Sequence, residues 1–395
     1  MPSLNRVQLL KLLLHLIYFL SGIATVLIGQ VLPILAKHFV LTDLQLGYFF
    51  PSQFAGSLFG TFITSRLAKR NNYMAATVAG GIAMAAGVLI MNVDSIEICL
   101  AGFFVLGVGI GLTLPAINMM IVEIDPATSG PALSVLNLYW GIGAIICKPL
   151  VDLFSTADQI GLTAVVLAIP LLAASLGLKA AGRRRMHEST DHEHPAAADG
   201  VGPIWRTPIA WAIAFFNFVH VGFESGMGGW LTTYTERLAG EPYVNWLSPT
   251  LLYFLLFVIG RAAAPTLFRF LNENRMLFLG LGIMLTGIFL TLSAGTVFML
   301  AIGASVTGFG TSWIFPTNVS RFSKVFGPSS TRRATPLFMF GTLGAAASTW
   351  LIGYLSEQTG DLRYGMFVLG GSVVILIILQ IMLSLRETRK NAASA

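Results

Sequence analysis

Residues 107–118 read GVGIGLTLPAIN, and residues 308–319 read GFGTSWIFPTNV. Each segment carries Gly-x-Gly, then five residues, then a proline, and the two segments lie 201 positions apart. Nearly the same offset relates two further pairs of segments: Gly143-Ala144 to Gly344-Ala345, and Gly22 and Gly29 to Gly222 and Gly229. Three pairs of segments at almost one spacing indicate that the second half of the chain duplicates the first.

The composition is that of a membrane protein. Charged residues make up 11% of the chain and hydrophobic residues 55%, with a mean hydropathy of +0.76, whereas a soluble protein carries about 25% charged residues. A helix of about 20 apolar residues crosses the hydrocarbon core, and spans are helical because backbone groups in lipid must bond internally. The all-α prediction comprises twelve spans, near 10–36, 43–65, 73–93, 97–121, 133–155, 159–180, 207–233, 247–269, 276–293, 297–319, 334–355 and 363–385.

Basic residues set the predicted orientation. With a cytoplasmic N-terminus, most of the 24 Lys and Arg fall on the cytoplasmic side, as the positive-inside rule requires. We therefore expect a multi-pass protein of the plasma (inner) membrane, in contact with lipid and with both termini in the cytoplasm. Residues 1–20 are interpreted as a retained first helix, because their apolar run is too long for a signal peptide and lacks a small-residue cleavage site. Short basic loops between spans argue against a nucleic-acid partner.

The longest polar interval divides the chain into two sets of six spans. We predict an N-terminal six-helix bundle over 1–180, a cytoplasmic linker over 181–205 and a C-terminal six-helix bundle over 206–395. Histidines and acids within the linker are typical of a solvated segment, so no metal site is predicted there. Two pseudo-symmetric halves are typical of transporters whose binding site lies between repeats at the membrane midplane.

The count of six and six spans, the cytoplasmic central loop and the basic loop after span two resemble the major facilitator superfamily over essentially the whole chain. That family carries G-x-x-x-D-R-x-G-R-K between spans two and three. Here Arg66, Lys69 and Arg70 keep the basic positions, while Ser65 replaces the acid and Ala68 the glycine. The resemblance implies a gating role for the three basic residues, with a weakened ionic latch.

Arg261 follows Gly260 at the equivalent place after span eight. The resemblance implies a gate-associated role for Arg261, with substrate contact as the alternative. Glu123 and Asp125 end span four on the cytoplasmic side and are candidates to hold the inner gate by bonding to Arg66 or Arg321.

A finer resemblance is to the fucose-permease-like branch of sugar symporters. It rests on four motifs, and it implies a sugar substrate driven by H⁺. That branch carries an acid four residues before the asparagine of span four, where this chain has Leu114. The proton-coupling residues of the branch therefore do not carry over. The four motifs are Ile314-Phe315-Pro316-Thr317, Gly107-x-Gly109 with Asn118, Gly141-Ile142-Gly143-Ala144, and Glu224 with Trp230-Leu231.

Span seven contains a charged residue in an apolar segment. Asn217, His220 and Glu224 are spaced i, i+3 and i+7 and share one helix face. Because an ionised carboxylate in lipid costs several kcal/mol, Glu224 must face a wet cavity, pair with a cation or be protonated. We interpret this face as a cavity wall, with Glu224 as sugar acceptor or proton carrier. The alternative is a structural acid locked to a neighbouring helix.

Span five carries a second polar stripe, formed by Asn137, Gly141, Ala144 and Lys148. A buried lysine readily loses its proton or finds an anion, so Lys148 is a candidate to bind an acidic substrate such as a sugar acid. An i, i+4 ion pair with Asp152, or snorkelling to the interface, accounts for it equally well.

Further cavity candidates are aromatic and amide side chains within spans. Aromatic rings stack on the apolar faces of sugars while amides bond to their hydroxyls. Helix packing is the alternative for each of them. The candidates are Gln45 and Tyr48 on one face of span two with Ser52, Asn118 in span four, Trp140 in span five, and Trp313 and Asn318 in span ten.

The sequence contains no nucleophile–base set, metal-ligand spacing or phosphate loop, which argues against an enzyme and against any cofactor. We predict a monomeric secondary transporter of alternating-access type, moving a sugar coupled to H⁺ through Glu224. Na⁺ is less favoured, because no pair of intramembrane acids shares a face. The alternatives are an organic-anion transporter that uses Lys148, a drug or lipid exporter, and a receptor that binds solute without moving it.

Overall fold

The computed structural model describes residues 6–68, 70, 72–124, 129–156, 159–183, 204–243, 247–327 and 334–394. Packing contacts divide the chain into two compact units. Unit 1 comprises Met1–Leu41 with Tyr48–Ala198, and unit 2 comprises Thr42–Gly47 with Asp199–Ala395. The predicted linker lies largely outside the described residues, so its bounds stay a prediction.

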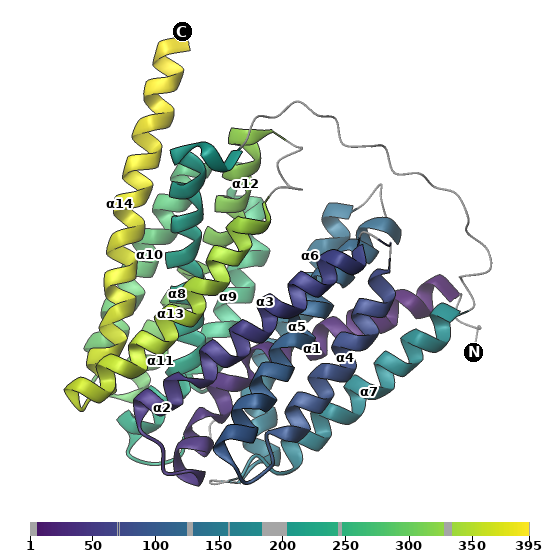
Figure 1. The fold of residues 1–395 in the computed structure, drawn as a ribbon. Helices are drawn as coiled ribbons and strands as arrows, with labels where there is room; N and C mark the ends of the chain where they lie inside the picture. Colours follow the sequence, from purple (N-terminus) through teal and green to yellow (C-terminus); the bar gives the residue numbers. More distant parts are fainter. Residues whose placement is uncertain are drawn as a thin grey trace. The chain divides into compact units, whose positions relative to one another are not determined.

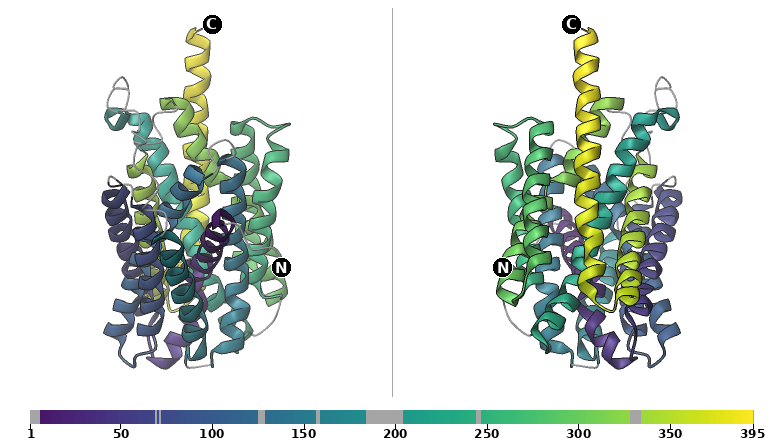
Figure 2. Two further views of the ribbon diagram at one scale, coloured as in Figure 1. Left: turned by 90° about the vertical axis from the view of Figure 1, so that its right-hand side faces the viewer. Right: turned by 90° about the vertical axis from the view of Figure 1, so that its left-hand side faces the viewer.

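Helices account for all the regular structure in the described residues, which confirms the all-α prediction, and within each unit the long helices pack side by side (Figure 1). Unit 1 contains α1 (Arg6–His38), α3 (Phe49–Ala68), α4 (Tyr73–Ile90), α5 (Ile96–Ile124), α6 (Ser129–Phe154) and α7 (Leu162–Arg183). Unit 2 contains α2 (Asp43–Gly47), η2 (Ile204–Arg206), α8 (Pro208–Ala239), α9 (Pro249–Leu267), α10 (Glu273–Ser293), α11 (Val297–Thr311), α12 (Ile314–Phe326), α13 (Thr335–Thr359) and α14 (Leu362–Ser394). Figure 2 shows α14 as one long helix that runs to the C-terminus.

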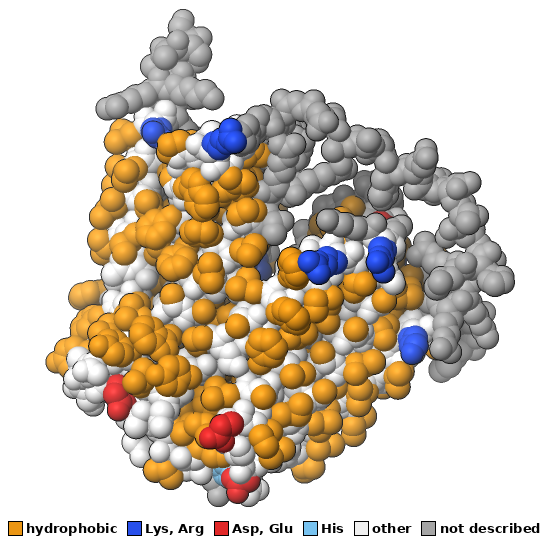
Figure 3. Space-filling view, viewed as in Figure 1, with side chains coloured by type: hydrophobic (Ala, Val, Ile, Leu, Met, Phe, Trp, Pro, Cys, Tyr) orange, Lys and Arg blue, Asp and Glu red, His pale blue; other side chains and the backbone are white. Residues whose placement is uncertain are grey.

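Ten helical segments in the described part of the chain are long and apolar enough to cross a membrane, with Val297–Phe326 counted as one of them. Helices α3 and α8, which match predicted spans two and seven, are not among the ten. The polar face of Asn217, His220 and Glu224 lowers the hydropathy of α8. Each unit is covered mainly by hydrophobic side chains in the view of Figure 3, with Lys and Arg gathered at one end of each.

The glycine pairs that indicated a duplication make equivalent contacts in the two units. A Cβ atom added to Gly143 of α6 would overlap the carbonyl oxygen of Phe19 on α1. A Cβ atom added to Gly344 of α13 would likewise overlap the carbonyl oxygen of Phe218 on α8. Small residues let membrane helices approach to backbone contact, so the repeated glycines fix the same helix pair in each half. Gly107 and Gly308 repeat this relation against the carbonyl oxygens of Gln53 and Tyr253.

Gly344→Ala is expected to destabilise unit 2 by about 1–3 kcal/mol, because the new methyl group forces α8 and α13 apart. Gly371→Ala is the matched control, since a Cβ atom there meets nothing within 4 Å and alanine is the better helix former by up to about 1 kcal/mol. Thermal unfolding of the two variants in detergent measures the difference. Equal melting temperatures would show that the α8–α13 contact is looser than described.

The predicted span 43–65 is not one continuous helix, and this corrects the sequence analysis. Helix α2 ends at Gly47, Tyr48 forms a turn, and α3 begins at Phe49. The start of α2 is fixed by a capping box, in which the N–H of Thr42 donates to Oε1 of Gln45 (3.0 Å) and the N–H of Gln45 donates to Oγ1 of Thr42 (3.4 Å). Gln45 therefore caps a separate short helix and does not share a continuous helix face with Tyr48 and Ser52.

The predicted span 297–319 is also divided. Helix α11 ends at Thr311 and α12 begins at Ile314, with Ser312 and Trp313 between them. Proline has no N–H, so Pro316 leaves the carbonyl of Ser312, four residues earlier, without its helical donor. Thr311 and Ser312 at this break are bonded to His220 and Arg261, which are the neighbours of Glu224.

Candidate functional site

Glu224 lies near the middle of α8, and its side chain is 23% exposed. His220 and Asn217, one and two turns earlier on the helix, are each 1% exposed. The other side of α8, at Gly222 and Gly226, packs against α13 and α14. Glu224 and His220 therefore lie toward α9 and α11, whereas Asn217 bonds to α13.

Arg261 approaches Glu224 from α9, with 3.9 Å between its Nη2 and Oε1 of the carboxylate. This distance is too long for a hydrogen bond, so the two side chains attract each other electrostatically without being locked together. The Arg261 guanidinium is held elsewhere: Nε donates to the carbonyl oxygen of Ser312 (3.2 Å), and the group lies 4.2 Å from the ring centroid of Phe257.

His220 flanks the carboxylate on the other side. Its Nδ1 lies 4.0 Å from Oε2 of Glu224, and its Nε2 makes a 3.0 Å hydrogen bond with the hydroxyl of Thr311 on α11. Glu224 thus lies between a cation and an imidazole, within electrostatic reach of both and beyond hydrogen-bond length of either. A carboxylate held in this way can accept a proton or a ligand hydroxyl without first breaking a hydrogen bond to these two neighbours.

Several buried polar atoms of unit 2 have no hydrogen-bond partner among the described residues. Asn217 donates to the carbonyl of Leu337 (2.9 Å), and Asn318 donates to the carbonyl of Ile213 (3.2 Å). The Oδ1 atoms of both asparagines and the hydroxyl of Tyr253 are buried and unpaired. Since buried polar groups are nearly always satisfied, these atoms mark places for water or a polar ligand.

Lys148 lies in unit 1, where it is 5% exposed and forms an ion pair with Asp152 one turn along α6. This is the structural alternative that the sequence left open. Asn137, at the other end of the same predicted stripe, is exposed, and its amide donates to the carbonyl of Leu133 on its own helix (2.8 Å).

Lys148→Gln is expected to lower the free energy of unfolding by about 2 kcal/mol, because it leaves the half-buried Asp152 carboxylate without a cation. A second change, Asp152→Asn, is expected to restore most of the stability, because the pair is then neutral. Thermal unfolding of the single and double variants measures the coupling. Additive losses would show that Lys148 is held by other partners.

The remaining predicted binding residues are dispersed over the two units. In unit 1, Asn118 accepts a hydrogen bond from the hydroxyl of Tyr18 (3.3 Å), Trp140 is partly buried on α6, and Tyr48 is exposed at the turn before α3. In unit 2, Trp313 is fully buried and its indole N–H donates to the carbonyl of Met276 (2.9 Å). Trp313 therefore packs inside unit 2. Of the predicted residues in that unit, His220 and Arg261 lie beside Glu224, whereas Asn217 and Asn318 bond to backbone carbonyls of Leu337 and Ile213.

The predicted gate residues are only partly described. Arg66 is exposed and its guanidinium lies 4.3 Å from the ring centroid of Phe62, while Arg70 and Glu123 are exposed. Lys69 and Asp125 lie outside the described residues. Arg321, a proposed partner of Glu123, is 3% exposed and donates to Oε1 of Gln380 (2.6 Å).

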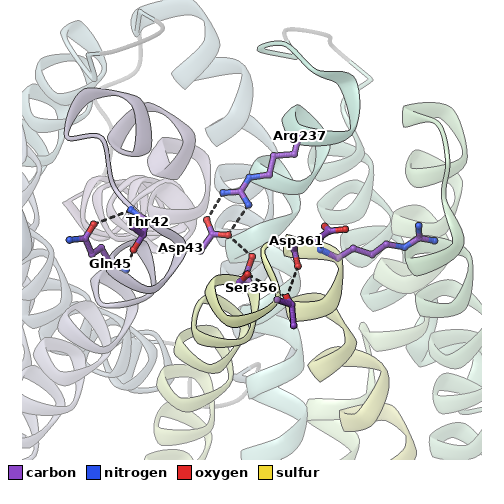
Figure 4. Close-up of polar contacts among 8 residues, drawn as sticks. Thr42, Asp43, Gln45, Arg237, Ser356 and Asp361 are labelled. Atoms are coloured by element: carbon purple, nitrogen blue, oxygen red, sulfur yellow. Dashed lines mark hydrogen bonds and ion pairs between the residues drawn. The ribbon is translucent and has the colours of Figure 1, made fainter.

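Sequence reasoning missed one polar cluster in unit 2. Asp43 of α2 accepts hydrogen bonds from both Nη atoms of Arg237 on α8, one of them 2.7 Å long, and from the hydroxyl of Ser356 on α13 (Figure 4). Asp43 and Ser356 are buried, whereas the Arg237 side chain is 43% exposed. The pattern Thr42-x-x-Gln45 was the only local signal, and it predicts a helix start there without naming a partner.

Metal binding has no support in the described residues, where no group of three or more His, Cys, Asp or Glu is placed to hold an ion.

Comparison with curated proteins by sequence gives no match. Among solved structures, the E. coli fucose:proton symporter FucP is 17% identical, with a TM-score of 0.63 and coverage of 96% of this chain and 99% of that one.

A D-xylose-proton symporter is 14% identical (TM-score 0.75, covering 95% and 97%), and the nucleoside transporter NupG is 12% identical (TM-score 0.75, covering 94% and 99%). These identities establish a shared fold and leave the solute open. The sequence model of the Major Facilitator Superfamily matches residues 14–297. With two helical units, a polar centre inside unit 2 and this match over most of its length, the chain belongs to the Major Facilitator Superfamily of membrane transporters.

Proposed function

We propose that this transporter carries a sugar or sugar-like solute by alternating access, coupled to H⁺ through Glu224. The observation that supports the proposal is the carboxylate of Glu224, part-exposed inside a span-length helix and 3.9 Å from Arg261 and 4.0 Å from His220. Intramembrane acids are functional candidates because an idle charge there costs several kcal/mol.

Proton coupling requires that Glu224 lose its proton more easily to one side of the membrane when substrate is absent. Arg261 stabilises the ionised form by attraction, and burial in α8 stabilises the protonated form. These opposing influences allow either state to be populated during a cycle. A solute hydroxyl that bonds to the carboxylate shifts the balance between them, and this links solute binding to proton binding.

Unpaired acceptor atoms in unit 2 favour a solute rich in hydroxyl groups. The Oδ1 atoms of Asn217 and Asn318 accept hydrogen bonds, as does the carboxylate of Glu224, and hydroxyl groups are donors for such atoms. Two of the similar folds are named as fucose and D-xylose symporters with protons, and a third as a nucleoside transporter. A nucleoside also presents a ribose, so hydroxyl recognition is common to all three.

An organic-anion substrate is the second candidate, and it depends on Lys148. The ion pair with Asp152 occupies that lysine in unit 1. Sugar-acid transport would therefore need Asp152 to release Lys148 or to take up a proton. For this reason we place the neutral sugar first.

Uptake of labelled hexoses, nucleosides and sugar acids into proteoliposomes, with and without an inward proton gradient, tests the proposal. We expect gradient-stimulated uptake of a neutral sugar. Uptake confined to sugar acids would transfer the role to Lys148, and stimulation by a Na⁺ gradient alone would exclude H⁺ as the coupling ion. Failure of every solute on the panel would overturn the sugar assignment.

A further inference from the structure

The break between α11 and α12 leaves a buried backbone carbonyl in unit 2 without its helical donor. In a continuous helix the carbonyl of Ser312 would accept from the N–H of residue 316, which is a proline. The structure supplies a replacement donor from another helix: Nε of Arg261 donates to this carbonyl over 3.2 Å. Arg261 therefore satisfies the acceptor that Pro316 leaves unpaired.

The other half of the duplication solves the same problem with a neutral group. Pro115 is the counterpart of Pro316, and it leaves the carbonyl of Gly111 without a helical donor. The hydroxyl of Thr64 on α3 lies 3.1 Å from that carbonyl oxygen, and it is equally close to the carbonyl of Gly60 on its own helix (3.1 Å) and to that of Leu112 (3.2 Å). Helix α5 nevertheless runs unbroken from Ile96 to Ile124. Unit 2 differs on two counts, because its helix is interrupted and its replacement donor carries a charge.

Two polar neighbours of Glu224 are bonded to this break. His220 bonds to Thr311, the last residue of α11, and Arg261 bonds to Ser312, the next residue. The same two side chains lie 4.0 Å and 3.9 Å from the two carboxylate oxygens of Glu224. A change in the charge of Glu224 therefore acts on two groups that hold consecutive residues of the interrupted helix.

We propose that Arg261 is a positioning residue that couples the charge of Glu224 to the break between α11 and α12. The ionised carboxylate draws the guanidinium away from Ser312 and loosens the break. The protonated or ligand-bound carboxylate releases Arg261 to bond fully to Ser312, and the break tightens. This inference rests on the proposed role of Glu224 as proton carrier and adds the element that responds to the proton.

Among the described residues, the polar groups around Glu224 come from α8 itself, α9 and α11. His220 lies on the same helix as Glu224, and α9 presents Arg261 and Tyr253. Tyr253 is close enough to interact electrostatically with both Glu224 and Arg261. Helix α11 presents the hydroxyl of Thr311 to His220. Helices α13 and α14 contact the other side of α8, at Gly222 and Gly226.

Hydrogen exchange of the full-length protein in lipid nanodiscs, read on the peptide that spans residues 309–322, tests the coupling without solute or gradient. Arg261→Gln is expected to raise the exchange rate there by about tenfold, the equivalent of one charged hydrogen bond. Glu224→Gln is expected to lower it by about threefold, because a modest ion-pair competition is removed. Arg261→Lys keeps the charge without the Nε donor and is expected to behave like Arg261→Gln.

Pro316→Ala separates this coupling from a general loss of stability. Alanine at position 316 restores an N–H that can donate to the carbonyl of Ser312. Arg261→Gln is therefore expected to have little effect on the exchange rate in the Pro316→Ala background. Pro115→Ala in α5 is the matched control and is expected to leave the effect of Arg261→Gln unchanged. The inference would be overturned if Arg261→Gln still raised the exchange rate in the Pro316→Ala background. It would also be overturned if Glu224→Gln left the exchange rate unchanged. Because the measurement needs no transport, its failure is distinct from failure of the uptake assay.

Discussion

Glu224→Gln is expected to reduce uptake driven by a proton gradient by about 100-fold, the lower range of what a positioned proton-transfer group contributes. Glutamine has the shape of glutamate and keeps one acceptor oxygen for a solute hydroxyl, but it cannot carry a proton. Exchange of labelled for unlabelled solute, which needs no net proton movement, is expected to be preserved. Parallel assays of uptake and exchange in the same proteoliposomes give both numbers.

Glu357→Gln is the control for this experiment, because Glu357 is an exposed acid on α13 that undergoes the same chemical change. It is expected to retain wild-type uptake. If gradient-driven uptake survives Glu224→Gln, the carboxylate is a structural partner of Arg261 and the proton is carried elsewhere. If exchange is lost together with uptake, Glu224 binds the solute and the assignment of proton carrier is unsupported.

Arg237→Met is expected to lower the free energy of unfolding by about 3 kcal/mol and the melting temperature by several degrees. Two guanidinium nitrogens donate to the carboxylate of Asp43, and the aspartate side chain is only 10% exposed. Without the arginine, a buried charge keeps Ser356 as its remaining donor in this cluster. The partial exposure of Arg237 places the expected loss at the low end for a broken buried pair.

A double-mutant cycle with Asp43→Asn separates the ion pair from packing of the arginine side chain. The double variant is expected to recover most of the loss, because no uncompensated charge remains. Protease sensitivity of residues 39–48 is the second measurement, since release of α2 from α8 and α13 exposes that segment. Wild-type protection in Arg237→Met would contradict the claim that the pair holds α2 in place.

Local patterns were sufficient for most of the fold and for part of the site. Apolar periodicity located the helices, and the spacing of glycines identified equivalent segments of the two halves, whose glycines make equivalent backbone contacts, such as Gly143 with Phe19 and Gly344 with Phe218. The i, i+4 spacing of Lys148 and Asp152 raised the ion pair as one of two alternatives. Each of these signals lies within one helix or repeats at a fixed offset, so it can be seen without knowledge of the tertiary structure.

Contacts between distant helices could not be anticipated in this way. Arg261 was assigned to a gate by resemblance, and no pattern placed it beside Glu224 of α8 or on the carbonyl of Ser312. The division of span two escaped prediction because its hydropathy is continuous across Tyr48, whereas the break depends on how α2 docks. Asp43 was invisible for the same reason, since its partners lie 194 and 313 residues away along the chain.

The position of α2 in the sequence determines which fragments of the chain contain a whole compact unit. Its residues, Thr42–Gly47, belong by contact to unit 2, while the helices that precede and follow it along the chain belong to unit 1. A polypeptide cut within the central linker would leave the second fragment without α2 and the first fragment with a surplus helix. One helix of unit 2 is therefore encoded within the N-terminal half of the sequence, and a fragment that begins at the linker lacks part of its own compact unit.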